Sequence, residues 1–363
     1  MNTQRHILIA AGGTGGHVFP ALAIADELKK LEPDACFLFV GTNDKIEARI
    51  VPQRGYAFTS IWISGFHRNF RMSNLVFPLK VACAFIQSFF LIVKFRPDIA
   101  IGTGGYACGP VLYLASLFGI PIVVHESNSF PGVTTRMLSS RAAKLFTAFE
   151  TTSRWLKRSN NIEVVGTPTR ELLGSVSQED GIKFFGLNKN KKTVLVFGGS
   201  LGAASINQAI QAMVDDFARA GIQFIWQTGK SDAALAEAMK QKHIGWVHSF
   251  IDAMENAYAA ADVVVCRAGA TTLAEITRLG KAAILIPYPH AAADHQTVNA
   301  RTLVESDAAV MIADHEVSIR LKQELFSLLN DDVKRLAMSE ACRKFGRPDA
   351  GKIIAGKILT LIK

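Results

Sequence analysis

The sequence predicts an α/β protein built of two doubly wound domains, and three observations lead to this prediction. The chain has 363 residues, and at roughly 100–200 residues per domain this length favours two domains. Short apolar runs alternate with segments of helical period along the whole chain, which is the pattern of parallel sheets joined by crossover helices. This alternation starts twice, each time with a strand that leads into a glycine-rich turn.

The first half opens with an apolar run and an amphipathic helix. After the strand expected at 6–11, apolar residues from Ala21 to Leu31 recur at helical spacing and share one face. The other strands expected in this half cover residues 36–40, 99–103, 121–124 and 144–146.

The second half repeats the same plan. A strand at 193–197 leads into Gly198 and then a helix, and further strands are expected at 223–227, 246–250, 262–266 and 282–286. The stretch 174–192 is polar and charged, so we expect a hinge between about 166 and 192. The expected domains are 1–166 and 167–341, followed by a helical segment at 342–363 that packs back on the first. Ligands of such folds bind outside the carboxyl ends of the strands, here in the cleft between two domains.

The bulk composition restricts the setting and the partners. Nearly half of the residues are hydrophobic, which indicates a globular chain, and the net charge of +9 favours nucleic acid, acidic lipid or phosphorylated substrates as partners. The five cysteines form no C-x-x-C pair and are odd in number, so reduced thiols in a cytosolic setting are expected. The N-terminus runs directly into a strand pattern, which argues against a secretory signal.

The segment 75–95 is the most apolar of the chain. Pro78, Lys80, Gln87, Ser88 and Lys94 interrupt it, whereas a spanning helix needs ~20 mostly apolar residues with few or no charges. Two alternatives stay open: a helix buried in the first domain, which we favour, and an interfacial helix at the bilayer surface.

Three glycine-rich turns are candidates for ligand binding. They cover residues 12–16, 102–106 and 198–203, and glycines at the start of a helix let backbone N–H groups approach a phosphate. A tight turn needed only for packing is the alternative at each. No P-loop motif occurs, whereas Gly102, Gly104 and Ala107 fit a loose G-x-G-x-x-A that keeps a dinucleotide enzyme open.

Metal and cofactor motifs are missing from the sequence. No two aspartates stand two positions apart, so the D-x-D that holds a divalent cation in many sugar-nucleotide transferases is not present. No histidine pair has zinc-ligand spacing on a helix. We expect neither a metal nor a cofactor.

Eight motifs together resemble one family, the bacterial N-acetylglucosaminyltransferases that form lipid II. They follow the family in order and spacing over nearly the whole chain. The motifs are GGTGGHVFPALAIADEL (12–28), GTGGY (102–106), HESN (125–128), VVGTPTR (164–170), GGSLGA (198–203), FIDAM (250–254), CRAGATTLAEI (266–276) and DHQ (294–296).

This resemblance implies a GT-B fold of two Rossmann-like domains, the first facing acceptor and membrane and the second holding the UDP-sugar. It implies inverting, metal-independent transfer of N-acetylglucosamine from UDP-N-acetylglucosamine to the muramoyl 4-hydroxyl of lipid I, which forms lipid II for peptidoglycan. It implies a peripheral protein on the cytoplasmic side of the cell inner membrane, with an anionic membrane surface and no nucleic acid as partner.

The resemblance also implies site residues. His17 is the best candidate for proton transfer, since histidine titrates near neutral pH; Glu126 and His125 are competitors, and capping or anion binding is the alternative role of His17. The implied donor contacts are Thr14, Gly15, Gly16, Asn128, Arg170, Ser200, Ile251, Ala270, Thr271, Thr272, Leu273, Ala274, Glu275 and Gln296.

Side-chain chemistry supports several of these roles. Arg170 can form bidentate bonds to phosphate, Ile251 can read a base only through its backbone N–H and C=O, and a carboxylate at Glu275 can accept both ribose hydroxyls. A solvated surface charge is the alternative for Arg170 and for Glu275. Four positions differ from the usual family wording, and at Leu201 an apolar side chain stands where a polar one is usual; these positions are Ser127, Thr167, Leu201 and Thr271.

A mixed aromatic and basic stretch at 66–71 is expected to face the membrane; the alternative is that its aromatic residues cover the core. Three other functions stay open. They are a related transferase that makes glycolipid, a nicotinamide-dependent oxidoreductase, and a nucleotide-sugar-binding module without catalysis.

Overall fold

The computed structural model describes residues 4–65, 76–157, 160–291 and 294–362 of the chain. They form two compact units, the first made of Met1–Arg170 with Arg347–Lys363 and the second of Glu171–Gly346. The chain passes between the units within the stretch where a hinge is expected, although residues 167–170 belong to the first unit instead of the second. Residues 342–346 stay with the second unit, so the returning segment begins at Arg347 instead of 342.

The first unit is a parallel sheet covered by helices on both faces. Among the described residues its strand order is β3-β2-β1-β4-β5-β6-β7, and every pairing is parallel. The strands are β1 (His6–Ala10), β2 (Cys36–Gly41), β3 (Ala57–Ser60), β4 (Ile99–Gly102), β5 (Ile122–Glu126), β6 (Lys144–Thr147) and β7 (Ile162–Val164).

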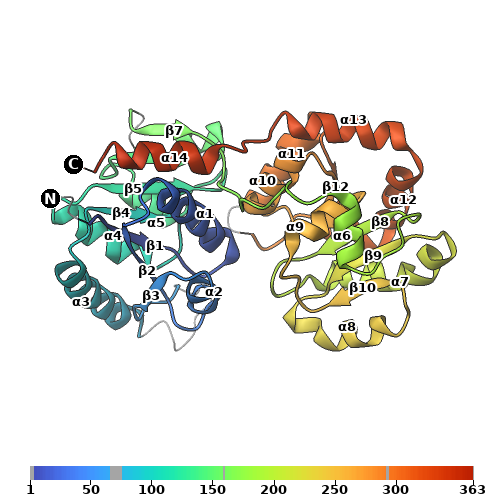
Figure 1. The fold of residues 1–363 in the computed structure, drawn as a ribbon, viewed down its shortest axis with the longest axis horizontal. Helices are drawn as coiled ribbons and strands as arrows, with labels where there is room; N and C mark the ends of the chain where they lie inside the picture. The colour runs from blue at the N-terminus through green and yellow to red at the C-terminus, as the bar shows by residue number, and fades with distance from the viewer. Residues whose placement is uncertain (1–3, 66–75, 158–159, 292–293, 363) are drawn as a thin grey trace. The chain divides into compact units, whose positions relative to one another are not determined.

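Alternate residues of β1 point into two separate cores. Ile7 and Ile9 pack under one helical layer, whereas Leu8 and Ala10 pack under the other. The helices are α1 (Gly15–Leu31), α2 (Glu47–Gln53), α3 (Phe77–Phe95), α4 (Cys108–Leu117), α5 (Val133–Leu138), the 3₁₀ helix η2 (Glu150–Trp155) and α14 (Ala350–Leu359). Ile354 and Ile358 of α14 share the core of α1, and Figure 1 shows these two helices side by side.

The second unit repeats this plan with a smaller sheet. In the described part of the chain its order is β10-β9-β8-β11-β12-β13, again parallel throughout. Its elements are α6 (Gln178–Phe184), β8 (Thr193–Phe197), α7 (Ala204–Arg219), β9 (Gln223–Gln227), η3 (Lys230–Asp232), α8 (Ala233–Lys240), β10 (Gly245–His248), α9 (Met254–Ala260), β11 (Val263–Cys266), α10 (Ala270–Leu279), β12 (Ala282–Leu285), α11 (His295–Val304), β13 (Val310–Met311), η5 (Asp314–Glu316), α12 (Val317–Asn330) and α13 (Asp332–Arg343).

The structure confirms the two doubly wound α/β units and all ten expected strands, whose ends differ from the expected ones by at most two residues. Three further strands, β3, β7 and β13, were not expected from the sequence. Each lies at the edge of its sheet, and none has a fully buried residue. An edge strand that is only half covered needs no continuous apolar run, so the sequence gives it no strong signal.

The favoured expectation that the apolar segment 75–95 forms a buried helix is wrong, because helix α3 is largely exposed or half-buried. It spans Phe77–Phe95, and only Ala84, Ser88 and Ile92 of it are buried. In the described part of the chain it is the one helix long and apolar enough to cross a membrane, which by length and composition alone is weak evidence of spanning. Figure 1 shows it at the rim of the first unit beside α4. One side of the helix therefore packs on the core, with Leu91 and Phe95, while several of its large apolar residues are exposed.

Candidate functional site

The first glycine-rich turn joins β1 to α1 at the carboxyl edge of the first sheet. The carboxylate of Glu47 is buried beneath it and accepts the N–H of Gly13 at 3.1 and 3.2 Å and the N–H of Thr42 at 3.0 Å. The N–H of Gly13 is therefore already bonded to the carboxylate of Glu47, which argues against a phosphate at Gly13. The expected contacts Thr14, Gly15 and Gly16 follow at the start of α1. The sequence interpretation missed Glu47.

His17 is held in one orientation by the loops around it. Its Nδ1 lies 3.0 Å from the carbonyl oxygen of Gly12, and since a carbonyl can only accept, Nδ1 carries the proton. In neutral imidazole the lone pair then lies on Nε2, which has no hydrogen-bond partner within the described residues. The ring lies against Gly104, where a Cβ would come within 2.8 Å of Nε2. Glycine in the 102–106 turn thus makes room for a ring that can accept a proton.

Glu126 and His125 end β5 and take part in structural contacts. The buried carboxylate of Glu126 accepts four hydrogen bonds: from the N–H and the side-chain amide of Asn128, both at 3.0 Å, from the N–H of Gly132 at 3.0 Å, and from the hydroxyl of Thr135 at 2.6 Å. This fits a residue that holds the loop after β5 better than one that takes a proton from a substrate. His125 is fully buried, its Nε2 lies 3.0 Å from the carbonyl oxygen of Gly166, and burial lowers its pKa.

Two expected donor contacts belong to the first unit. Asn128 is tied to Glu126 by its backbone N–H and by one N–H of its amide, so its side-chain oxygen and the second amide N–H are left for a ligand. Arg170 ends the first of the two segments that make up this unit, and its guanidinium stacks over the ring of Phe19 at 4.6 Å from the centroid. The guanidinium is therefore packed on α1 instead of being a freely solvated surface charge.

The glycine turn of the second unit has open backbone donors. It joins β8 to α7, and within the described residues the N–H groups of Gly199, Ser200 and Leu201 have no acceptor. The following helix α7 adds its own N-terminal partial charge. Ser200 is exposed, and the unusual Leu201 is 68% exposed, so its side chain covers nothing. This turn, with no described carboxylate on it, is the better phosphate site of the two.

Gln227, at the end of β9, is a second residue that the sequence interpretation missed. Its amide nitrogen donates to the carbonyl of Gly199 at 2.8 Å, and its amide oxygen accepts the N–H of Ile251 at 2.9 Å. The N–H of Ile251 is therefore already bonded in this structure, and its carbonyl is the backbone group that remains for a base. Gln227 connects the phosphate turn with the segment that carries Ile251.

Helix α10 begins at Ala270 directly after the loop that follows β11. Leu273 is buried in the core and Ala270 nearly so, so these two can offer a ligand only backbone groups; Thr271, Thr272 and Ala274 are partly exposed. Glu275 is 3% exposed and accepts a hydrogen bond from the hydroxyl of Tyr258 at 3.0 Å. Burial and then the charge of Glu275 raise the pKa of Cys266 at the end of β11. Glu275 is therefore an inward carboxylate at the carboxyl edge of the sheet and not a solvated helix charge.

Two groups order the loop after β12. Gln296 on α11 accepts the N–H of Tyr288 at 2.9 Å, which leaves its amide nitrogen for a ligand. Arg267, which the sequence interpretation also missed, donates to the carbonyls of Ile286 at 3.2 Å and Pro287 at 3.1 Å and pairs with Asp314 at 2.5 Å. Burial opposes ionisation of Asp314, but hydrogen bonds from Ser205 and Arg267 hold its pKa below the usual value. Arg267 thus joins the loops after β11 and β12.

The expected residues thus form two groups, one at the carboxyl edge of each sheet. His17, Glu126, Asn128 and Arg170 belong to the first unit, and Ser200, Ile251, the start of α10 and Gln296 belong to the second. Within the residues that the structure describes, no three His, Cys, Asp or Glu side chains come together as a metal site.

The chain is similar to known transferases along nearly its whole length. Residues 7–147 match the glycosyltransferase family 28 N-terminal domain, and residues 193–353 match the family's C-terminal domain. A UDP-N-acetylglucosamine--N-acetylmuramyl-(pentapeptide) pyrophosphoryl-undecaprenol N-acetylglucosamine transferase of Prosthecochloris aestuarii is 41% identical, covering 98% of this chain and 99% of its own length. The protein of the same name from Listeria monocytogenes is 40% identical, with the same coverage of 98% and 99%.

Solved structures agree with the fold. The crystal structure of Acinetobacter baumannii MurG superposes with a TM-score of 0.73 at 27% identity, covering 98% of this chain and 99% of that one. A UDP-GlcNAc 2-epimerase from Neisseria meningitidis bound to UDP-GlcNAc superposes with a TM-score of 0.71 at 13% identity, covering 98% and 100%, and this likeness concerns the fold alone. Two parallel-sheet units of this kind make the GT-B fold.

Proposed function

This chain belongs to glycosyltransferase family 28, and from that premise we propose that it transfers N-acetylglucosamine from UDP-N-acetylglucosamine to the muramoyl 4-hydroxyl of lipid I, forming lipid II. The strongest support is the similarity to transferases of that name over 98% of the chain. A dehydrogenase or a binding module without catalysis has no comparable support. The glycolipid transferase differs in its acceptor, which the experiment below addresses.

The second unit binds the donor in this proposal. The three open N–H groups of the 199–201 turn and the N-terminus of α7 receive the diphosphate. Glu275 accepts the ribose hydroxyls, the carbonyl of Ile251 meets the base, and the amide nitrogen of Gln296 donates to the sugar. Ala270, Thr271, Thr272 and Ala274 at the start of α10 lie beside the donor in this proposal, whereas the N–H of Leu273 already donates to the carbonyl of Gly269 at 3.0 Å.

The first unit supplies the proton acceptor. His17 presents an Nε2 lone pair because Nδ1–H is held by Gly12, so it can take the proton of the acceptor hydroxyl as that oxygen attacks the anomeric carbon. The N–H groups of the 199–201 turn, together with Arg170, would stabilise the negative charge on the leaving UDP. Glu126 keeps Asn128 and its loop in place, and we assign it a positioning role.

The test is release of UDP with lipid I present and absent. Transfer to lipid I predicts UDP release that requires lipid I and yields lipid II in equal amount. A transferase for glycolipid would release UDP with a diacylglycerol acceptor instead, and a binding module would release none. Either of these outcomes would overturn the proposal.

Activity should survive a strong chelator. The chain lacks D-x-D, so the diphosphate charge must be met by backbone N–H groups and arginine. We expect the rate of UDP release in excess chelator to equal the rate in added magnesium. Complete loss in chelator with rescue by magnesium would contradict this mechanism.

We further propose that α3 rests on an anionic membrane surface at the cytoplasmic side of the inner membrane. Its outward residues form an exposed apolar face, and the ring of Phe89 lies 5.7 Å from that of Phe118 at the end of α4. Lys80 adds a cation on the same helix, near the ring of Trp62. The face consists of Leu79, Ile86, Phe89, Phe90 and Val93, which are 43–66% exposed, with Leu117 and Phe118 beside it. The aromatic and basic stretch at 66–71 lies outside the described residues.

Replacing Ile86 and Phe90 by glutamate should weaken binding to anionic vesicles. These side chains are 58% and 66% exposed, so the change should leave the fold intact while placing two carboxylates against the bilayer. We expect about a tenfold loss of vesicle affinity in sedimentation, corresponding to ~1.4 kcal/mol. UDP affinity should stay unchanged.

The matched control replaces Ile319 and Val333 by glutamate, which are 78% and 80% exposed in the second unit. It changes the net charge equally but should leave vesicle binding near the wild-type value. Equal loss in both variants would mean that net charge, not the α3 face, governs binding.

A further inference from the structure

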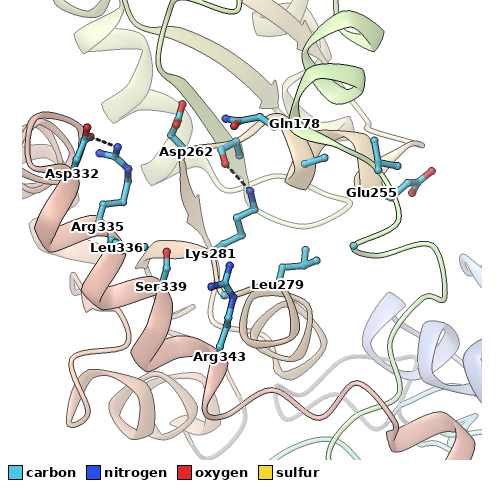
Figure 2. A pocket seen from close by; sticks show the side chains of 15 residues that line it. Gln178, Glu255, Asp262, Leu279, Lys281, Asp332, Arg335, Leu336, Ser339 and Arg343 are labelled. Atoms are coloured by element: carbon cyan, nitrogen blue, oxygen red, sulfur yellow. Dashed lines mark hydrogen bonds and ion pairs between the residues drawn. The ribbon is translucent and has the colours of Figure 1, made fainter.

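The second unit contains a cavity of about 540 Å³ at the edge of its sheet opposite to the ligand loops. Asp262 and Lys281 line it and directly precede β11 and β12, so they lie at the amino ends of strands whose carboxyl ends carry the loops described above. Helix α13 forms one wall (Figure 2). The volume lies within the ~300–1,000 Å³ of typical small-molecule sites.

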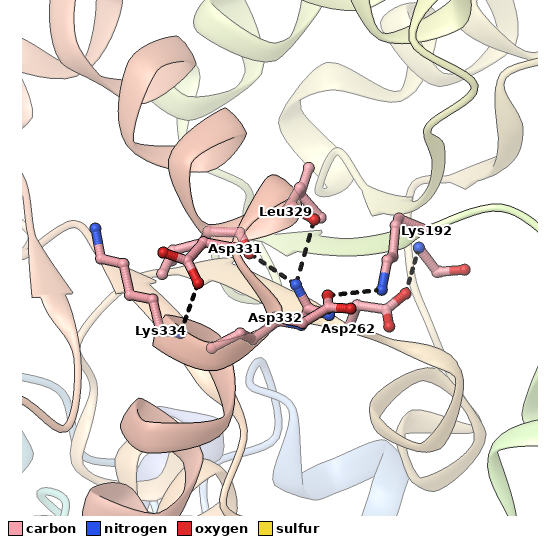
Figure 3. Close-up of polar contacts among 9 residues, drawn as sticks. Lys192, Asp262, Leu329, Asp331, Asp332 and Lys334 are labelled. Atoms are coloured by element: carbon pink, nitrogen blue, oxygen red, sulfur yellow. Dashed lines mark hydrogen bonds and ion pairs between the residues drawn. The ribbon is translucent and has the colours of Figure 1, made fainter.

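Most charges around this cavity already have partners. Asp332 pairs with Lys192 at 3.2 Å (Figure 3). It also pairs with Arg335, which donates to the carbonyl of Leu328 at 2.8 Å. The carboxylate of Asp262 accepts the N–H of Thr193 at 2.7 Å. These contacts hold α13 against the amino edge of the sheet and leave these groups little capacity for a ligand.

Two cations in the same cavity, Lys281 and Arg343, form no ion pair within the described residues. Lys281 donates to the carbonyl of Ala261 at 2.8 Å, and within the described residues no carboxylate lies within ion-pair distance of Lys281 or Arg343. The pKa of Lys281 is lowered to about 8, chiefly by burial; the charge of Asp262 opposes this shift and that of Arg343 adds to it. Two like charges therefore lie in one space, and the described carboxylates that share it with them unpaired, Asp262 and Glu255, stand beyond ion-pair distance.

The position of Arg343 depends on a glycine. Gly280 ends α10 with φ of 61°, in the left-handed region that favours glycine. A Cβ at this position would lie 2.2 Å from Cγ and 2.5 Å from Nε of Arg343. The arginine stem thus crosses directly over Gly280, and its guanidinium reaches the side of the cavity where Lys281 lies (Figure 2).

We propose that this cavity is a second ligand site, which binds a small organic phosphate between Lys281 and Arg343. A phosphate dianion matches two cations, and a guanidinium can bond two of its oxygens at once. Ser339 and Gln178 supply further polar groups, and Leu279 and Leu336 offer apolar surface to the organic part. The site does not depend on the proposed transferase activity.

Acetylation of Lys281 on the intact chain tests this proposal. A water-soluble acetylating ester reacts with neutral amines, and peptide mass spectrometry reports each lysine separately. Glucose 1-phosphate in large excess over its Kd should slow acetylation of Lys281 about tenfold, whereas glucose with sodium chloride at matched ionic strength should not. The exposed Lys189 serves as internal control and should react equally in all samples.

Variants and pH sharpen the test. Arg343→Gln should weaken the protection of Lys281 about tenfold. Gly280→Ala should have the same effect, because it displaces Arg343 without removing its charge. Arg219→Gln, at an exposed arginine of α7, is the control and should have no effect.

The affinity for the phosphate should also depend on pH. Because the bound anion favours charged Lys281, the affinity should fall as pH rises through about 8. The charged groups facing Lys281 are Asp262, Arg343, Glu255 on α9, and the Asp332–Arg335 pair on α13.

Phosphate bound at the 199–201 turn would leave Lys281 acetylation unchanged, because that turn lies at the other edge of the sheet. Equal acetylation of wild-type Lys281 with and without glucose 1-phosphate would overturn the proposal. So would equal protection by sodium chloride, which would indicate screening instead of binding.

Discussion

Replacing His17 by alanine should lower turnover by ~10²–10⁴-fold, the range typical of a lost general base. The geometry explains the size of this effect. The Nδ1–H donates to the carbonyl of Gly12, so Nε2 carries the only lone pair of the ring that can accept a substrate proton. The affinity for UDP, measured by calorimetry, should stay nearly unchanged because the proposed donor contacts of the second unit are intact.

Two further variants separate proton transfer from support of the turn. Asparagine at position 17 can donate to Gly12 as Nδ1–H does, but it lacks the Nε2 lone pair, so His17→Asn should be as slow as His17→Ala. If His17→Asn keeps most of the activity, the hydrogen bond to Gly12 matters and the base lies elsewhere. His243→Asn, at an exposed turn with φ of 52° that asparagine tolerates, is the control and should keep full turnover.

Replacing Glu275 by alanine should weaken UDP binding by ~1.5–3 kcal/mol, the contribution expected of a hydrogen bond to a charged group. This corresponds to roughly a 10–150-fold higher Kd in calorimetry. The carboxylate is 3% exposed and oriented by the hydroxyl of Tyr258, so it accepts ribose hydroxyls without first being ordered. Tyr258→Phe keeps the carboxylate but removes this contact, and should cause a smaller loss.

Inorganic pyrophosphate distinguishes a ribose contact from general damage. It has no ribose, so its affinity should be the same for Glu275→Ala and for the wild-type protein. If pyrophosphate and UDP lose affinity equally, Glu275 supports the phosphate turn or the fold. Unchanged UDP affinity would exclude the ribose role. A thermal melt of each variant checks that this buried position tolerates the change.

Much of the fold could be predicted because its central strands are buried on both faces. Every residue of β8 and β11 is buried, and apart from Thr193 at the start of β8 both are continuous apolar runs, which are visible in the sequence alone. β13 has two residues, both only partly buried, so it has no comparable pattern. The apolar composition of α3 predicted a helix but not its surroundings, since apolar side chains suit a core and a membrane surface equally.

The site was predicted in the same uneven way. The sequence by itself determined the position of the glycine turns, because each follows a recognisable strand, and through eight ordered motifs it determined the family. It also placed His17 and Glu275 among the candidates. What it could not determine is which backbone N–H groups and charges are already satisfied.

Only the tertiary structure decided those pairings. Glu47 lies 34 residues from the Gly13 N–H that it accepts, and Gln227 lies 24 residues from that of Ile251. Arg343 reaches across Gly280 from another helix toward Lys281. Hydrogen bonds and charge pairs act over a few ångströms in space, whereas a sequence pattern reports the character of each residue and its near neighbours. The sequence therefore indicates which chemical roles each side chain can take, and the tertiary structure decides which of these groups remain available to a ligand.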